Sequence, residues 1–552
     1  MKHTFCPAIL ANKAMSIFSK STRYIKLFIL VFFMSSSIIN LCGQNNKNAQ
    51  ILNTMKSAAK YMMDVASYKG GFVWNYLPDF SRTWGEMEAK RTMVWIQPPG
   101  TPAVGHLMID AYHATNDEYY YECAKRIANT LIWGQLPCGG WNYMFDFDGE
   151  QSMKDWYSTI GKNGWRLEEF QHYYGNATFD DAGTIQAAKF LLRLYLEKYD
   201  PTYRESLDKV IDLVLKSQYS IGGWPQRYPL MNNHPFLGKS DYTSFITLND
   251  GVISENIDFL LQCYSALGLS NLKEPIMRAM NLMLLLQQGQ PYAGWSDQYN
   301  VDDLNPAHGR SYEPRSINTG TTARMIGVMI DLFKLTGETK FLSGIPSAIN
   351  FIESQKLSEP DLSKWGHSLK DKNIILVPRF VDPESGKPLY VHRKGSNVKN
   401  GFYYTDQNIE NTIAHYSSAI FINVETLKKA YQNALSIPQE EIVKNTFFKN
   451  NKSVEVDRYY FKPYTKAQAE SVEKIIKEFH KEGYWLSQLK QISNPYKENS
   501  DNVDIKSDET KYATTMVGDE FDTSPYSSEK PVMGISTATF INNMTTLIYS
   551  IK

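Results

Sequence analysis

The sequence predicts an all-α protein in which helical hairpins stack into an α/α toroid, either closed or incomplete. Two observations predict this fold: one segment pattern recurs along the chain, and apolar residues within it recur at helical spacing. The composition agrees, because 43% of the 552 residues are hydrophobic and 21% are charged, as in ordinary globular proteins.

The recurring pattern is a helix, a short polar turn, a second helix, a glutamine and a Gly-Trp loop. It covers residues 110–141, 193–224 and 262–295, with a weaker copy at 331–355. The loop tryptophans are 83, 71 and 70 residues apart, at Trp141, Trp224, Trp295 and Trp365. Gly70-Gly71-Phe72 is a candidate for an earlier copy.

Apolar residues of the second copy follow the spacing of one helix face, at Leu207, Val210, Ile211, Val214 and Leu215. A single hairpin cannot bury this face alone, so neighbouring hairpins must stack. Each Gly-Trp loop follows the same helix of its pair, and the loops should therefore gather at one end. In a toroid that end is a bowl suited to a ligand. The tryptophans would either line this bowl or plug the loops into the core.

The N-terminus is typical of a secretory signal peptide, which we assign to residues 1–43. Basic residues precede an uncharged run from Leu27 to Leu41, and Cys42-Gly43 follows. We therefore expect an exported protein, periplasmic or extracellular. Acylation of Cys42 is the alternative, although Leu41 stands where a lipoprotein has a small residue. No later run is long enough to predict a membrane span.

Three segments are expected after the signal peptide. They are N-terminal hairpins with an aromatic loop at 44–129, the toroid core at 130–445, and a helical extension with a polar loop at 446–552. The 58 basic and 58 acidic residues cancel, which argues against a nucleic-acid binder. Aromatic residues make up 13% of the chain, which suits stacking on sugars. We expect a monomer.

Polar residues gather at three stations near the expected helix starts and loops. The first two hold Asp180 with Asp181, and Asn249 with Asp250, at equivalent places in two copies. The third station, at 305–314, holds His308, Arg310, Tyr312 and Glu313. Each acidic pair alone is explained by helix capping. Their recurrence in one repeat phase instead favours a shared bowl, where carboxylate and amide oxygens suit Ca²⁺.

Several motifs resemble those of the pectate lyases of polysaccharide lyase family 10. They are ATFDDAGTIQ at 177–186, GGWPQRYP at 222–229, ITLNDG at 246–251, GWSDQYNVDDLNPAHGRSYEP at 294–314 and VPRFVDPESGKPLYVHRKG at 377–395. The resemblance extends over about residues 130–410. Two departures stand out: GGWNYM at 139–144 lacks the family's lysine, and TFDD leaves the choice between Asp180 and Asp181 open.

The resemblance implies an α/α toroid that uses Ca²⁺ and cleaves polygalacturonate, or a related uronan, by β-elimination. It implies Arg310 as the catalytic base and Asp180 or Asp181, with Asp250, as metal ligands. It also implies an acidic polysaccharide as the partner, contacted by Trp224, Arg227, Tyr228, Asn249, Tyr312, Glu313, Arg379 and Arg393.

Elimination removes the C5 proton of a uronate and expels the glycosidic oxygen from C4, which leaves a C4–C5 double bond. Cations at the uronate carboxylate stabilise the negative charge that develops. Arginine is an unusual base because it normally stays protonated, so the rate should rise into alkaline pH. His308 is the reserve candidate for the base. Two other functions stay open: a hydrolase that uses Asp180 and Glu313 as its acid and base, and a glycan-binding protein without catalysis.

Overall fold

The computed structural model describes residues 47–164, 170–231, 240–364, 373–395, 402–447, 456–462, 469–490, 492–497, 514 and 531–551. The predicted signal peptide with Cys42, the loop tryptophan Trp365 and most of the C-terminal polar loop lie outside these residues. Within them, every helix is too short or too polar to cross a membrane.

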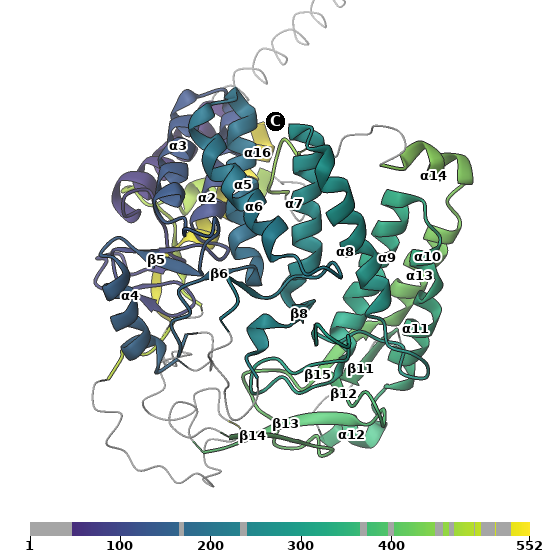
Figure 1. Cartoon of the computed structure of the whole chain (residues 1–552). Coiled ribbons are helices and arrows are strands. Elements are labelled where there is room, and N and C mark those ends of the chain that lie inside the picture. The colour runs from purple at the N-terminus through teal and green to yellow at the C-terminus, as the bar shows by residue number, and fades with distance from the viewer. Residues whose placement is uncertain are drawn as a thin grey trace, which may run out of the picture.

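Helical hairpins are the main architecture, as predicted, and they succeed one another in an arc around the molecule (Figure 1). A first helix covers residues 47–61. It is followed by α2 (Thr101–Thr115), α3 (Glu118–Trp133), α4 (Glu150–Trp156), α5 (Gly183–Lys198), α6 (Arg204–Ser217), α7 (Val252–Leu267), α8 (Lys273–Leu285), α9 (Thr319–Thr336), α10 (Lys340–Ser343), α11 (Ile345–Ser354), α12 (Glu359–Lys364), α13 (Val424–Leu435), α14 (Gln439–Asn445), α15 (Ala469–Lys477) and α16 (Thr537–Ile551).

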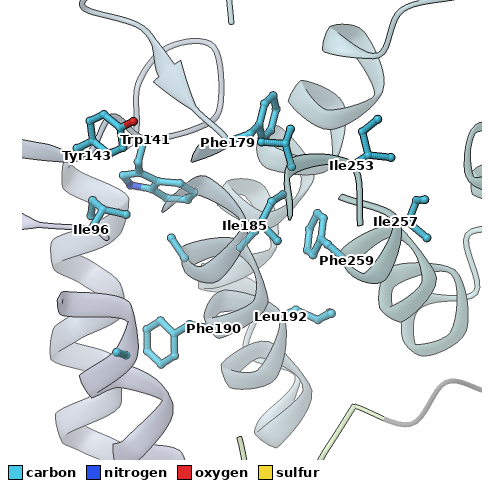
Figure 2. Packing of buried hydrophobic residues seen from close by; sticks show 14 of the residues in the cluster. Ile96, Trp141, Tyr143, Phe179, Ile185, Phe190, Leu192, Ile253, Ile257 and Phe259 are labelled. Carbon is cyan, nitrogen blue, oxygen red and sulfur yellow. The ribbon is translucent and has the colours of Figure 1, made fainter. Parts of the chain in front are cut away.

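From α16 to α7, the first helices of neighbouring hairpins pack against one another. Helix α16 lies on α2, α2 on α5, and α5 on α7, while α9 packs on α11 and α13. One cluster of buried side chains runs through these helices, from Ile51 to Ile548, so the three predicted segments share a core. Figure 2 shows part of it, with Phe190 of α5 and Phe259 of α7 among the packed rings. The arrangement is an α/α toroid, and the C-terminal helix α16 closes onto its N-terminal end.

The Gly-Trp loops are plugs that fasten each hairpin. Trp141, Trp224 and Trp295 are fully buried, and their indole N–H groups donate to carbonyls of Leu131, Val214 and Met283 in the helices before them. Of the two interpretations of these tryptophans, the plug is confirmed. Trp485 makes the same bond to Ile475 of α15, which identifies a further loop of this kind, after α15, that the sequence pattern did not show.

Glycine is required in two of these loops. Gly139 and Gly222 have φ of +104° and +116°, a region that disfavours other residues. A Cβ atom would also lie 2.2 Å from the Lys209 carbonyl oxygen or 2.6 Å from that of Arg278. The loops therefore touch the backbone of the following hairpin, and this contact holds adjacent hairpins in register.

Short β-ladders cover the loop end of the toroid, which the all-α prediction did not include. Each pairs, in antiparallel register, the strand before the first helix of a hairpin with a strand after a Gly-Trp loop. We call these first helices the inner helices. These pairs are β4 (Met93–Trp95) with β5 (Met144–Asp146), β6 (Ala177–Thr178) with β7 (Arg227–Tyr228), β8 (Ile246–Thr247) with β9 (Gln298–Tyr299), and β10 (Ile317–Asn318) with β12 (Phe380–Val381). Two-residue strands carry too little periodicity to be recognised in a sequence.

Larger sheets form at two places. Strands β13 (Pro388–Lys394) and β14 (Phe402–Asp406) extend the β10–β12 ladder to four strands, in the order β10-β12-β13-β14. Strands β11 (Ile374–Pro378) and β15 (Ala419–Asn423) pair beside it. A five-stranded sheet joins the chain ends in the order β16-β17-β1-β2-β3, with strands Leu486–Gln488, Met533–Ser536, Asn75–Tyr76, Thr83–Trp84 and Glu88–Ala89.

Candidate active site

A pocket of about 380 Å³ lies where the inner helices α5, α7 and α9 begin. The β-ladders just described carry the chain into these helix starts, so the residues between strand and helix face a common space. The lining residues are Asp181, Asn249, Asp250, Arg310, Tyr312, Asn318, Gly320, Thr321, Arg324, Arg379 and Tyr416. The positive ends of three helix dipoles also point toward this region, which favours anionic ligands.

Arg310 is held in place by two buried carboxylates. Its Nη2 donates to Asp180 Oδ2 at 3.0 Å, and its Nη1 donates to Glu313 Oε1 at 3.2 Å. The backbone N–H of Arg310 donates to the other Glu313 oxygen at 2.9 Å. The guanidinium is only 6% exposed, yet it reaches the pocket wall. Its orientation is therefore fixed by the ion pairs rather than by solvent.

Each of these carboxylates has a tyrosine partner as well. Tyr143 donates to Asp180 Oδ2 at 2.5 Å, and Tyr416 donates to Glu313 Oε1 at 2.9 Å. Burial and the charge of Glu313 raise the pKa of the Tyr416 phenol well above its ordinary value, so it stays protonated as a donor.

Asp181, rather than Asp180, is the structural equivalent of Asp250. Both residues have left-handed backbone conformations, with φ 48° and ψ 34° for Asp181 and φ 48° and ψ 23° for Asp250. Both side chains line the pocket, whereas Asp180 lies fully buried beneath it. The structure therefore pairs Asp181 with Asp250 by backbone conformation and by place in the pocket, while the choice of metal ligand stays a prediction.

The capping interpretation of these acidic residues is wrong. No side-chain oxygen caps α5 or α7, or the short turns Asp180–Ala182 and Asn249–Gly251 that precede them. Asp180 instead pairs with Arg310, and Asp181 accepts a hydrogen bond of 2.7 Å from Gln97. Their oxygens are thus directed across the repeats toward the pocket region.

The pKa of Asp180 shifts in the opposite direction to those of Asp181 and Asp250, because Asp180 is the one of the three that forms an ion pair with Arg310. Burial alone would raise the pKa of Asp180, but the Arg310 cation and the Tyr143 hydroxyl hold it below its ordinary value. Burial and the charges of Asp180 and Glu86 raise the pKa of Asp181 to about 7. Burial, Asp180 and Asp181 raise the pKa of Asp250 well above its ordinary value. Burial and mutual repulsion thus favour the protonated forms of Asp181 and Asp250 on this side of the pocket.

The structure brings the three predicted stations together. Asp181, Asn249, Asp250, Arg310, Tyr312 and Arg379 line one pocket, with Asp180 directly behind Arg310. The roles assigned to them remain predictions, but their convergence from distant parts of the chain is a property of the fold.

Three residues predicted to contact substrate are buried and lie outside the pocket lining. Trp224 is a fully buried loop plug, and Arg393 is 1% exposed on β13. Arg227 lies between the rings of Tyr143 and Tyr174, away from the pocket.

Three other predicted residues also lie outside the pocket lining. Glu313 is 3% exposed and holds Arg310 instead of facing a ligand. Tyr228 takes part in the β6–β7 ladder. His308, the reserve base, places its ring edge against Phe245, so its position does not support that role.

Five pocket residues were missed: Asn318, Gly320, Thr321, Arg324 and Tyr416. Asn318 and Thr321 have the same place at the start of α9 that the acidic stations have at α5 and α7, so repeat phase alone was a usable signal. Arg324 lies one turn further into α9, where its charge resembles that of an ordinary solvated face. Tyr416 comes from a loop with no repeat signal.

Comparisons with known proteins agree with the motifs. The family model described as pectic acid lyase matches residues 147–410. No curated protein matches the chain. Among solved structures, a mutant family 10 polysaccharide lyase from Cellvibrio cellulosa in complex with trigalacturonic acid is similar at 16% identity and a TM-score of 0.40, covering 60% of this chain and 98% of that one.

A second similar structure is the GH76A α-1,6-mannanase from Salegentibacter sp. HEL1_6. It has 11% identity and a TM-score of 0.34, covering 92% of this chain and all of that one. The motifs at 177–314 and 377–395 fall within the region matched by the family model. Over residues 147–410, just under half of the chain, the sequence is therefore similar to the pectic acid lyase family.

Proposed function

We propose that the protein is a Ca²⁺-dependent lyase that cleaves pectate, or a related polyuronate, by β-elimination. The observation that carries the proposal is the shared pocket, which is lined by Arg310 together with Asp181 and Asp250. Because polyuronates lie outside cells, the proposal includes export, with residues 1–43 as the signal peptide. It also includes a monomeric state.

The acidic side of the pocket suits a hard cation. Asp181, Asp250 and Asn249 present oxygen donors. The raised pKa values of both aspartates reflect burial and, in addition, repulsion between carboxylates that a cation would relieve. Asp180 Oδ1 is also buried without a partner among the described residues. Within that part of the chain, no three His, Cys, Asp or Glu side chains form a complete metal-binding group. Ca²⁺ would therefore also need oxygens from substrate and water.

Bound Ca²⁺ would withdraw electron density from a uronate carboxylate and make its C5 proton more acidic. The protein's own contribution is to hold Arg310 as the base, since Asp180 and Glu313 fix its guanidinium from two sides. Those carboxylates also favour the protonated guanidinium, so only a small fraction is neutral and the rate should rise with pH.

The hydrolase alternative is less well supported. Its proposed acid and base, Asp180 and Glu313, both point at Arg310 and lie outside the pocket lining. A protein that binds glycans without cleaving them remains an outcome of the test below.

The test is to incubate the protein with polygalacturonate and follow the absorbance of the unsaturated uronate product. We expect activity with Ca²⁺, loss of activity with a chelator, and recovery when Ca²⁺ is restored. Arg310→Ala should lower the rate at least about a hundredfold. Arg315→Ala is the matched control, because Arg315 is half-exposed, pairs with Glu384 and lies outside the pocket lining. Saturated products, or a rate indifferent to chelation, would contradict the proposal.

A further inference from the structure

The pocket has a basic side that the acidic stations leave unused. Besides Arg310, two guanidinium groups line it, Arg324 from α9 and Arg379 from the residue before β12. Arg310 is neutralised by its ion pairs with Asp180 and Glu313. Arg324 and Arg379, by contrast, have no carboxylate of the described residues within ion-pair distance. Two positive charges therefore remain available to an anionic ligand.

The two arginines differ in how firmly they are held. Arg379 donates from Nε to the Ser417 carbonyl at 2.5 Å and lies over the Tyr416 ring. Arg324 uses only Nη2, which donates to the Leu248 carbonyl at 2.9 Å and to Thr321 Oγ1 at 3.3 Å. Its Nε and Nη1 donate to none of the described residues. The residue is exposed, and its side chain is tethered at one nitrogen.

The tether places Arg324 beside the second station. Leu248, whose carbonyl accepts the bond, directly precedes Asn249 and Asp250. A substrate carboxylate at Arg324 would therefore lie next to another substrate carboxylate, that of the cleaved uronate, which we assign to the cation at the acidic station. Adjacent carboxylates of this kind occur on neighbouring residues of an unesterified polyuronate.

We propose that Arg324 is a specificity-determining residue that binds a second carboxylate of the substrate, next to the uronate that is cleaved. This inference rests on the proposed function and narrows its substrate class to chains with successive free carboxylates. A methyl ester at that position would lose the charge-assisted hydrogen bond, which is about twice as strong as a neutral one. The site should therefore discriminate against partly methyl-esterified chains.

The experiment compares wild type, Arg324→Gln and Arg324→Lys with hexagalacturonate, polygalacturonate and partly methyl-esterified pectin. For Arg324→Gln we expect KM for hexagalacturonate to rise about tenfold, because a charge-assisted contact is lost. The change in kcat should stay within about twofold, and the preference for unesterified substrate should fall. Arg324→Lys should recover most of the loss in KM. Arg315→Gln, outside the pocket lining, should resemble wild type.

Calorimetric binding of hexagalacturonate to the same variants keeps the two proposals separate. We call the proposed binding of a second substrate carboxylate by Arg324 the anchor. If wild type binds without cleaving and Arg324→Gln binds more weakly, the lyase proposal is contradicted and the anchor is supported. Cleavage with unchanged KM, affinity and ester preference in Arg324→Gln would overturn the anchor alone. If Arg324→Gln lowers the melting temperature, Arg324→Lys decides: a folded Lys variant with wild-type ester preference supports the anchor, and one without it overturns it.

Discussion

The starts of α5 and α7 differ from the start of α9, although all three have the same place in the repeat. At α9, Asn318 caps the helix by accepting from the backbone N–H groups of Gly320 and Thr321 at 2.8 and 3.2 Å. At α5 and α7, Asp181 and Asp250 adopt left-handed conformations and cap nothing.

The difference identifies two helix starts whose conformation lowers the stability of the fold. Left-handed backbone at a non-glycine residue costs about 1–2 kcal/mol, and each aspartate also bears the repulsion of its acidic neighbours. Natural sequences retain such features mainly at functional sites. The uncapped starts are therefore the places where substitution should affect activity more than folding, and the capped start should show the reverse.

Replacing Asp250 by Asn should have the largest effect. The side chain keeps its size but loses the charge that we assign to cation binding, so we expect lyase activity to fall about a hundredfold or more. The melting temperature without Ca²⁺ should stay level or rise, because a neutral amide replaces a carboxyl whose charged form is disfavoured by burial and by Asp180 and Asp181. Product absorbance and thermal unfolding measure the two effects. A variant that is unstable yet active would reverse the comparison.

The stability of the chelated protein should depend on pH through Asp181. Its pKa is raised from 3.8 to about 7 in the folded state, so between these values the folded chain binds more protons than the unfolded one. The free energy of unfolding must then decrease as pH rises from about 4 to about 7. Thermal unfolding of Asp181→Asn across this range should show a shallower decrease than wild type. An equal slope in both proteins would mean that Asp181 titrates normally.

Removing the cap of α9 should give the smallest effect, and one mainly on stability. Asn318→Ala loses the cap and the 2.7 Å bond to buried Asp297, so we expect a loss of about 1–2 kcal/mol in the free energy of unfolding. The matched variant Asn249→Ala removes no cap and should cost less. Denaturant unfolding of the two variants makes the measurement. A larger loss in the free energy of unfolding for Asn249→Ala would show that the uncapped start contributes more to stability than the capped one.

The sequence by itself determined the repeat, the helical hairpins and the positions of the three stations. These follow from local signals: helical spacing of apolar residues, Gly-Trp loops at regular intervals, and polar residues before helices. Because one repeat phase places equivalent residues at one end of a toroid, the convergence of residues near 180 and 250 was also predictable, whereas residue 310 was grouped with them by the motif resemblance. The motifs added the residues that the family uses.

Only the tertiary structure decided which member of each polar group faces the pocket. Asp180 and Asp181 are neighbours in sequence, but a left-handed turn sends one toward Arg310 and the other into the pocket wall. Trp224 and Arg227 belong to the most specific motif, yet they are buried as structural parts of their loop. Arg324 and Tyr416 join the site through packing between elements far apart in sequence. Side-chain direction and long-range packing have no local signature, and for this reason the fold had to supply them.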